Sequence, residues 1–573
     1  MPLSHQSHSK PTNRPSVSSI SLDSSSISSL TYADDLQGLK PLPQAHAPLA
    51  CVDPSLAVPF DMSILTISHK RNHNTVKAVV VGGGIAGLAI AIMMDLAGME
   101  FDILERSTGN EPTMSSAIAL GPPALRLLEQ MDLLPQIERH SKIVAGLTII
   151  DGECRRLERV EGIDGERYGY PIRVMSREAL HKIFLDRVPK SHLHRGKLVV
   201  ETLQNPNGVS CKCSDGSTYY GDIIIGADGA QSLTRERMYV QLREQGKLPE
   251  ADMEASYYGH VTITGISDPL DKSIYPIAHD KESELQIMYT KDAPYTLWYV
   301  PIADNRVAWG LNHSSAPKYK QHAYSRPYIT PELRDSQELI AAASSSRPFP
   351  TVPAFTKPQL KAPSLLSSKS SPKMHDDWYV PASIDLEKDF SDLLDKRCAL
   401  GAGTVRDFVA RTPKKAISMI DNEERLYKTW YSGRIVLIGD ACHEHLVIGG
   451  QSVVQGILDG VCLVNLLYDM EFNGPSEFSK AFKKYQSTRI SVAKSSVEQT
   501  NMIDKIFQSQ GFKAGMVRKF MFGIVGSFNL KNDKLNNNRP QLSFLPFVED
   551  YGSSKANRQK ISARLSGSKT FTI

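Results

Sequence analysis

The stretch that decides the fold is KAVVVGGGIAGLAIAIMMDLAGMEFDILE, residues 77–105. An apolar run ends at Val81, three glycines follow, and a long apolar segment leads to a second run that ends at Glu105. A strand, a glycine turn, a helix and a second strand with an acidic residue at its end form the fingerprint of a Rossmann-type dinucleotide-binding unit. The part from Val79 to Gly98 is almost uncharged, as a membrane span would be, but its glycines and Asp95 favour a buried strand, turn and helix.

Each glycine of the turn has its own expected role. Gly82 permits the tight turn, Gly84 lets a pyrophosphate approach the backbone at the helix N-terminus, and Gly87 allows close packing of the helix on the strand. The acidic side chain after the second strand can accept hydrogen bonds from ribose hydroxyls. The motif does not separate NAD from FAD, and a glycine-rich turn without a ligand is the structural alternative. The expected cofactor-binding residues of this unit are Gly82, Gly84, Ala86, Gly87, Glu105 and Arg106.

Composition and charge bound the class of protein. The chain has 573 residues, 41% of them hydrophobic, which is enough for more than one globular domain. The formal net charge of +4 is too small to indicate a nucleic-acid partner, so we expect a small-molecule substrate. The seven cysteines show neither a C-x-x-C nor a metal-ligand spacing, which argues against a disulfide framework and a metal site. Since no secretory or transit signal is evident, we expect an intracellular, cytoplasmic location.

Changes in composition divide the chain into six parts. Residues 1–75 read as a disordered Ser/Pro-rich tail, because so polar a segment cannot bury enough apolar area to offset the entropy of ordering. Residues 76–240 read as the first part of the dinucleotide-binding domain, 241–313 as a β-sheet domain, and 314–374 as a mobile Pro/Ser-rich insertion. Residues 375–470 return to the first domain, and 471–573 form a C-terminal helical region and tail.

Hydrophobic patterning predicts the individual elements. In the first domain we expect a parallel α/β layer with strands at Lys77–Val81, Phe101–Leu104, Leu198–Glu201, Asp222–Ile225 and Arg434–Ile438, and helices at Ile85–Ala97, Pro123–Met131, Arg177–Val188 and about Gln451–Asp469. Between about 255 and 312 we expect β strands with the sequences YYGHVTITGI, SELQIMYT, YTLWYVPI and NRVAWGLNH. The stretch Gly511–Phe528 mixes an apolar face with three basic side chains, so it either packs on the core or makes a peripheral membrane contact.

Two further motifs each place an aspartate after an apolar strand. Asp228 lies in GADGAQS, residues 226–232, and Asp440 lies in GDACH, residues 439–443. Ligands bind at the C-terminal ends of strands in open α/β sheets, so both carboxylates are expected at the ligand edge. Each motif alone could be a turn with side-chain capping. Together with the glycine turn at residues 82–87, the two motifs form a series of three, which makes the ligand-binding interpretation stronger.

This trio resembles the group A flavoprotein monooxygenases, the family of p-hydroxybenzoate hydroxylase and many fungal FAD monooxygenases. The segment 116–134, the R-x-x-L helix start at Arg177, and RPQLSFLP at Arg539–Pro546 also resemble that family. The resemblance implies an α/β fold, with a Rossmann-type FAD-binding domain, an inserted β-sheet substrate domain and a C-terminal helical region. It implies that the glycine unit binds the ADP part of FAD, that Arg177 and Asp228 contact the middle of the cofactor, and that Asp440 contacts the ribityl chain and pyrophosphate.

The resemblance also implies an activity. NADPH or NADH, as a transient co-substrate, would reduce FAD, and O2 would then form a C4a-hydroperoxide that hydroxylates or epoxidises a small aromatic or terpenoid-like substrate. The single dinucleotide fingerprint suits a chain that holds FAD permanently and receives the nicotinamide without a second Rossmann domain. No side chain need be a nucleophile, because the flavin performs the chemistry. The resemblance therefore leaves the catalytic residues unassigned.

One segment departs from the family pattern. The family reads roughly H-P-x-x-P-x-x-G-Q-G-x-N, whereas residues 443–454 read HEHLVIGGQSVV, so both prolines, the second glycine and the asparagine are replaced. This departure motivates one alternative, a flavin-binding protein without turnover, and the shared fold motivates another, a flavin oxidase, reductase or halogenase. His443 and His445 are expected to be structural rather than catalytic. Trp298 is expected in an aromatic strand that faces the substrate, in preference to a halogenase motif.

Overall fold

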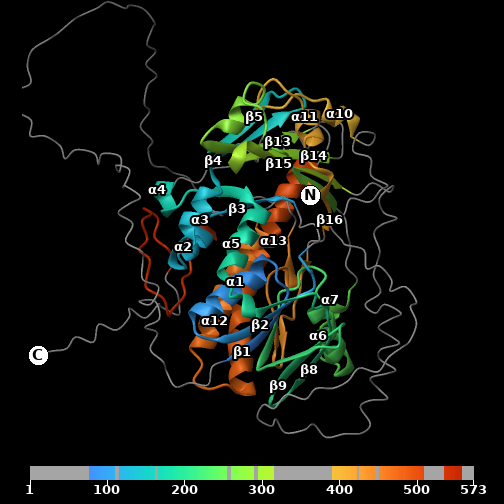
Figure 1. Cartoon of the computed structure of the whole chain (residues 1–573), viewed down its shortest axis with the longest axis vertical. Coiled ribbons are helices and arrows are strands. Elements are labelled where there is room, and N and C mark those ends of the chain that lie inside the picture. The colour runs from blue at the N-terminus through green and yellow to red at the C-terminus, as the bar shows by residue number, and fades with distance from the viewer. Residues whose placement is uncertain are drawn as a thin grey trace, which may run out of the picture. The chain divides into compact units, whose positions relative to one another are not determined.

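The computed structural model describes residues 76–109, 115–161, 165–254, 260–289, 295–314, 390–422, 425–445, 451–508 and 535–557 (Figure 1). All of them belong to the compact unit Ser68–Ile573. The predicted N-terminal tail, the predicted insertion beyond Ser314 and the stretch 511–528 lie outside the described residues. No described helix has the length and apolar character needed to cross a membrane. The stretch 79–98 forms a strand, a turn and a helix, as the sequence predicted.

A six-stranded sheet forms the centre of the first domain. Its strands, in spatial order, are β18 (Tyr431–Ser432), β19 (Ile435–Leu437), β11 (Ile223–Gly226), β1 (Lys77–Val81), β2 (Glu100–Glu105) and β7 (Leu193–Arg195). All neighbours are parallel except β18 and β19. The central strands are runs of valine and isoleucine that are buried on both faces, as a parallel sheet covered by helices requires. The predicted Rossmann-type core is confirmed.

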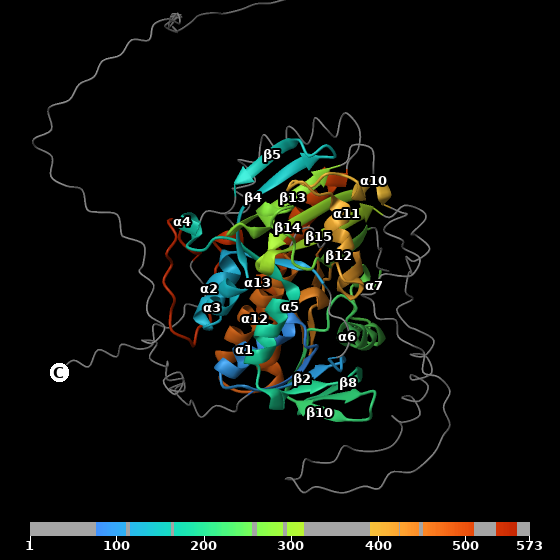
Figure 2. The ribbon, with the colours of Figure 1, turned by 45° about the horizontal axis from the view of Figure 1, so that its top comes forward.

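Helices α1, α12 and α13 pack side by side against this sheet (Figures 1 and 2). They span Ile85–Leu96, Ser452–Tyr468 and Pro475–Gln508. Helices α1 and α12 approach closely because α12 carries glycines at the contact: a Cβ at Gly460 would lie 3.3 Å from Met93 Sδ. The other helices of the first domain are α2 (Pro122–Gln130), α3 (Leu134–Arg139), α4 (Gly165–Tyr168), α5 (Arg177–Arg187), α6 (Leu233–Glu244) and α7 (Glu250–Met253).

A nine-stranded sheet forms the second layer. Its order is β16 (Ile417–Asn422), β12 (His260–Ile266), β15 (Arg306–Ser314), β14 (Tyr295–Ile302), β13 (Glu282–Tyr289), β4 (Lys142–Asp151), β6 (Arg173–Ser176) and β3 (Ala117–Leu120), with β5 (Arg156–Glu161) paired to β4. The predicted strands between 255 and 312 are confirmed as β12 to β15. Strands β3 to β6 come from residues 76–240, which the sequence grouped with the first domain. Strand β16 comes from residues 375–470, where the chain was expected to return to that domain.

The two faces of this sheet carry different hydrophobic clusters. One face packs on the short helices α10 (Ser391–Leu394) and α11 (Val405–Ala410) through residues such as Tyr299, Trp309 and Phe408. The opposite face, here called the inner face, carries Ile149, Trp298 and further apolar residues of β13, β14 and β15. Helix α13 of the first domain contacts β14.

One predicted strand lies elsewhere. Leu198–Glu201 was expected in the parallel layer, but β8 (Val199–Asn205) pairs antiparallel with β9 (Gly208–Cys213), which pairs with β10 (Thr218–Gly221). The expectation was wrong because a tight turn around Pro206 and Asn207 allows β8 to pair with its neighbour in sequence, which needs no crossover. A further two-stranded pair, β17 (Arg425–Leu426) and β20 (His443–Glu444), lies beside the GDACH motif.

Candidate functional site

The three motifs meet at one edge of the six-stranded sheet. Strands β19, β11, β1 and β2 are adjacent and parallel, so their C-terminal ends lie together. Backbone hydrogen bonds join these ends: Ala227 N–H donates to Val81 O at 2.8 Å, and Ile438 N–H donates to Gly226 O at 2.9 Å. The predicted ligand edge therefore contains the turn after β1, the GADG motif and the GD motif.

The glycine turn needs glycine at two positions for steric reasons. Gly82 has a φ of +104°, and a Cβ there would lie 2.5 Å from Ala227 O. A Cβ at Gly87 would lie 2.0 Å from Gly82 O, so the helix can approach the turn only without a side chain. Real Cβ atoms do not approach backbone oxygens so closely, which explains why both positions lack one.

Gly84 is different, because none of the described residues explains why it lacks a side chain. It is the N-cap of α1 with ordinary extended backbone angles, and a Cβ there would meet no heavy atom within 4 Å. No side chain caps α1, and its first turn contains no acidic residue. The N-terminus of a helix carries unpaired N–H groups and a partial positive charge, which favour an anion. The space at Gly84 therefore fits a phosphate group better than a side chain.

Glu105 lies at the end of β2, beside this turn. Its carboxylate accepts hydrogen bonds from Gly83 N–H at 2.6 Å and from Ser107 N–H at 2.8 Å. A carboxylate has about four lone-pair sites, so it retains capacity for ribose hydroxyls. Ala86, in the first turn of α1, packs against Gly439 and Gly456, and Arg106 is exposed to solvent.

His181, on α5, also holds the glycine turn, and the sequence did not single it out. Its Nε2 lies 2.9 Å from Gly83 O, so this nitrogen carries the proton. Burial lowers the pKa of His181, and the nearby positive charge of Arg177 lowers it further, whereas the Gly83 carbonyl and Glu105 act in the opposite direction. His181 lies one helical turn after Arg177, so the i, i+4 spacing could have indicated that both side chains share a face.

Asp228 has a local role in the structure. Its Oδ1 accepts from Ser232 Oγ at 2.6 Å, and its Oδ2 accepts from the Thr234 backbone N–H at 2.9 Å and from Thr234 Oγ1 at 3.0 Å. These bonds hold the N-terminus of α6, where Ser232 is the N-cap. The Asp228 carboxylate therefore lies at the predicted edge and is bound on both oxygens by its own loop.

Arg177 and Asp440 carry opposite charges at this edge. Burial lowers the pKa of Arg177, and the negative charge of Asp440 acts against that shift. The Arg177 guanidinium has no hydrogen-bond or ion-pair partner within the described part of the chain. Asp440 Oδ1 accepts from Ser452 Oγ at 2.5 Å. Ser452 is the residue that replaces the second glycine of the family pattern and is the first residue of α12.

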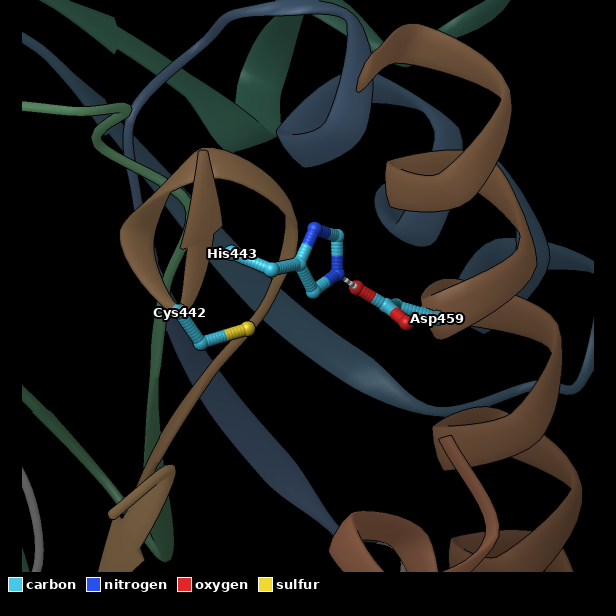
Figure 3. Close-up of side chains that lie close together, drawn as sticks. All are labelled: Cys442, His443 and Asp459. Atoms are coloured by element: carbon cyan, nitrogen blue, oxygen red, sulfur yellow. Dashed lines mark hydrogen bonds and ion pairs between the residues drawn. The ribbon is translucent and has the colours of Figure 1, made fainter. Parts of the chain in front are cut away.

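A buried aspartate supports the GD turn from behind. Asp459, on α12, accepts from His443 Nε2 at 2.6 Å (Figure 3). It also accepts from Gly439 N–H at 2.9 Å and from Arg489 Nε at 2.6 Å. Burial alone would raise the pKa of Asp459, but His443 and Arg489 outweigh this effect and hold it well below its usual range. The expected structural role of His443 agrees with this contact. A charged residue inside the otherwise uncharged segment 452–468 is the sequence signal that could have indicated a buried, paired acid.

Cys442, His443 and Asp459 lie close enough together to resemble a metal-ligand set (Figure 3). Three donors already occupy the Asp459 carboxylate, and one of them is the cation Arg489. Burial raises the pKa of the Cys442 thiol, which disfavours the thiolate that a metal needs. These hydrogen bonds, with Arg489 as the cation, therefore account for this cluster without a metal ion.

His445 is buried next to His443, and neither of its ring nitrogens has a hydrogen-bond partner among the described residues. The two imidazole rings lie edge to face with centroids 5.3 Å apart. Burial lowers the pKa of His445 to about 3, so the ring is neutral near pH 7.

Comparison with known families places these observations in context. The profile of the FAD binding domain family matches residues 75–326 and 378–500. The FAD-dependent monooxygenase atmM of Aspergillus flavus is 24% identical over 447 residues, which cover 76% of this chain and 77% of that protein. The FAD-dependent monooxygenase sdgC of Emericella nidulans is 27% identical over 406 residues, covering 67% of this chain and 71% of that protein.

Solved structures share the same fold. HpxO of Klebsiella pneumoniae, complexed with FAD and uric acid, has a TM-score of 0.53 at 16% identity and covers 81% of this chain and 95% of its own. The 2,6-dihydroxypyridine-3-hydroxylase of Arthrobacter nicotinovorans has a TM-score of 0.51 at 16% identity, with coverages of 77% and 95%. At such low identity the likeness establishes the fold, namely a Rossmann-type domain joined to a large β-sheet.

Proposed function

This chain belongs to the FAD binding domain family and is an FAD-dependent monooxygenase, and we propose that it uses NADPH or NADH and O2 to hydroxylate or epoxidise a small organic substrate. The substrate class follows the expectation from the sequence, an aromatic or terpenoid-like ring compound. The nicotinamide visits without a Rossmann domain of its own, since the chain carries one dinucleotide fingerprint. The proposal includes an intracellular location.

The observation that carries this proposal is the open, uncapped N-terminus of α1 at Gly84. In the proposed binding mode this N-terminus, with Ala86 and Gly87 in its first turn, would hold the FAD pyrophosphate. Glu105 receives ribose hydroxyls, and Arg106 beside it faces the solvent at the adenosine end. The Gly82 turn holds the backbone open at the position where a side chain would otherwise enter.

Charged residues at the same edge would contact the middle of the cofactor. The guanidinium of Arg177, which has no hydrogen-bond partner among the described residues, is placed to neutralise phosphate charge. The Oδ2 of Asp440 has no donor among the described residues and is placed to accept from a ribityl hydroxyl. Asp228 contributes chiefly by fixing the GADG backbone next to Gly82. Bound FAD would accept electrons from the nicotinamide and activate O2, and the protein would supply position and exclusion of water.

FAD binding is tested with a matched pair of glycines. Gly84 and Gly121 are both N-caps in extended conformation without a side-chain cap, and a Cβ at either meets nothing closer than 3.8 Å. Gly84→Ala should weaken FAD binding about tenfold or more and Gly84→Val should abolish it, because the side chain occupies the space of the pyrophosphate. Gly121→Ala should keep wild-type affinity. Equal FAD content in all three variants would reject the binding mode.

Turnover is tested by measuring flavin reduction, O2 uptake and H2O2 release. The FAD-loaded protein is reduced anaerobically with NADPH and with NADH, and O2 uptake and H2O2 release are then followed with phenolic and terpenoid compounds. A monooxygenase consumes one O2 for each NAD(P)H and incorporates one labelled oxygen atom from ¹⁸O2 into the product. Stoichiometric H2O2 without product would indicate an oxidase instead. Loss of reduction by both nicotinamides would favour a flavin-binding protein without turnover, the alternative motivated by the altered segment 443–454.

A further inference from the structure

Three buried side chains on the inner face of the nine-stranded sheet have polar atoms without a hydrogen-bond partner among the described residues. These atoms are Thr296 Oγ1 and Trp298 Nε1 on β14, and Asn312 Nδ2 on β15. The exposed fractions of the three residues are 1%, 8% and 4%. A buried polar group without a partner costs free energy, and native proteins retain few of them. Three on neighbouring positions call for a ligand.

The three side chains form one patch. Thr296 lies directly opposite Asn312 in the register of β14 and β15, and Trp298 lies opposite Gly310. Since alternate residues of a strand share a face, Thr296, Trp298 and Asn312 all project to the inner face. A Cβ at Gly310 would lie 2.4 Å from Trp298 Nε1, so the N–H edge of the indole lies over β15, the strand that carries Asn312. We call Thr296, Trp298 and Asn312 the polar patch.

A neighbouring strand fixes the direction of the Asn312 amide. Thr262 Oγ1, on β12, donates to Asn312 Oδ1 at 2.7 Å. With its oxygen held on that side, the amide presents its NH2 group as a free donor. The indole Nε1 can only donate, whereas the Thr296 hydroxyl can donate or accept. The polar patch therefore offers two fixed donors and one adaptable hydroxyl, which suits an oxygen atom of a ligand.

The described central positions of β12, β14 and β15 around the polar patch are uncharged. On the inner face, the central positions of β12, β14 and β15 are Thr264, Ile266, Val300, Ala308 and Gly310. The Thr264 hydroxyl is already used, since it donates to Ser115 O at 2.7 Å. A carboxylate or phosphate here would lack a counter-charge, whereas an apolar ring would lie against apolar side chains.

We propose that the polar patch binds the substrate, and that the substrate is a neutral ring compound whose hydroxyl or keto oxygen accepts from Trp298 Nε1 and the Asn312 amide. This inference rests on the proposed monooxygenase function, because it names the substrate class of that enzyme. Helix α13 of the first domain contacts β14, so a ligand bound at Thr296 and Trp298 would lie close to that domain.

The binding test uses 2-naphthol with two analogues, naphthalene, which lacks the oxygen, and 2-naphthoate, which is charged. Equilibrium dialysis against the FAD-loaded full chain should show that 2-naphthol binds about tenfold or more tightly than either analogue. Trp298→Phe and Asn312→Leu should each reduce this preference to about threefold or less, mainly by lowering the affinity for 2-naphthol. Trp309→Phe is the matched control, because Trp309 lies on the opposite face and its Nε1 already donates to Thr412 Oγ1 at 2.9 Å. It should leave the preference unchanged.

A second test needs no ligand and compares two buried threonines by the same isosteric change. Thr412 Oγ1 accepts from Trp309 and donates to Phe408 O at 3.0 Å, whereas Thr296 Oγ1 has no such partner. Thr296→Val should therefore keep or raise the thermal midpoint, and Thr412→Val should lower it by a few degrees. Such a gain in stability at a loss of binding is the pattern expected of a site kept polar for a ligand.

Two results would overturn the proposal. One is equal affinity of the wild-type chain for 2-naphthol and naphthalene, or a preference that survives both Trp298→Phe and Asn312→Leu. The other is a drop in thermal midpoint for Thr296→Val as large as that for Thr412→Val, since the hydroxyl would then have a partner in the resting protein. Both readouts are independent of turnover. Failure to reduce the flavin or to insert oxygen would count against the proposed function alone.

Discussion

Replacing Asp459 by asparagine should damage both the stability of the fold and the affinity for FAD. The change keeps the shape of the side chain but removes the charge that faces Arg489 at 2.6 Å in a fully buried position. The amide also has only one acceptor oxygen, whereas the carboxylate accepts from three donors. Whichever way the amide is turned, its NH2 group faces another donor, either Arg489 on one side or Gly439 N–H and His443 on the other.

The magnitude follows from the burial of the pair. Removing one partner of a buried ion pair costs about 3–5 kcal/mol, because it leaves an uncompensated charge. We therefore expect the thermal midpoint of Asp459→Asn to fall by roughly 10 °C. Because Gly439 N–H loses its acceptor, the turn that carries Asp440 loosens, and FAD affinity should fall about tenfold or more. Differential scanning fluorimetry and FAD titration of the apoprotein measure the two effects.

Asp550→Asn is the matched control. Asp550 pairs with the buried guanidinium of Arg539 at 2.8 Å, in the C-terminal segment and away from the GD turn. It should lose stability in the same way and keep FAD affinity. A second variant, Asp459→Asn with Arg489→Met, removes the stranded charge and should be more stable than Asp459→Asn alone. The reasoning is refuted if Asp459→Asn matches the wild-type protein in both measurements, or if the double variant is no more stable than the single one.

The same pair makes stability depend on pH. The pKa of Asp459 is held below its ordinary value of 3.8 in the folded protein, so the unfolded chain takes up the proton first as the pH falls. The contribution of Asp459 is complete above that value and is lost as the pH falls below it. Denaturant titrations between pH 6 and pH 3 should show this loss in the wild-type protein and a flatter profile in Asp459→Asn.

Three further predictions concern neighbouring residues. Asp440→Ala should weaken FAD binding by roughly ten- to a hundredfold, and Ser452→Ala should weaken it about threefold to tenfold in the wild-type background. In the Asp440→Ala background, Ser452→Ala should have no further effect, and additive losses in FAD titrations would contradict the hydrogen bond as the cause. In the wild-type protein, His445 should lower the free energy of unfolding by about 2–3 kcal/mol between pH 7 and pH 4.5, because the unfolded chain binds a proton below pH 6.5 that the folded ring, with its pKa of about 3, does not bind. His445→Phe should remove this loss of stability. Chemical denaturation measures it, and parallel pH profiles of the two proteins would disprove the prediction. Gly87→Ala should prevent correct folding of the turn, since its Cβ would lie 2.0 Å from Gly82 O, and a variant with wild-type circular dichroism and FAD content would show that the turn can yield.

The sequence by itself determined the Rossmann-type unit and the residues at its ligand edge. The strand from Lys77 to Val81, the glycine turn and the helix that follows are local features, specified by apolar runs and by Gly82 and Gly87, where a Cβ would collide with the backbone. The strands β12 to β15 were equally readable, because alternation and β-branched residues within each run suffice to predict them. The order of strands in each sheet, by contrast, follows from pairing between distant segments.

Only the tertiary structure decided which side chains meet behind and above that edge. Asp459 lies 16 residues from His443 and 30 residues from Arg489 along the chain. Its carboxylate contacts both side chains because α12 and α13 pack side by side. The sequence likewise does not show that Trp309 Nε1 has a hydrogen-bond partner whereas Trp298 Nε1 has none among the described residues, because both are tryptophans in buried strands. Local patterning fixes which face of a strand a residue occupies, whereas the partners of a polar atom depend on what the rest of the chain brings to that face.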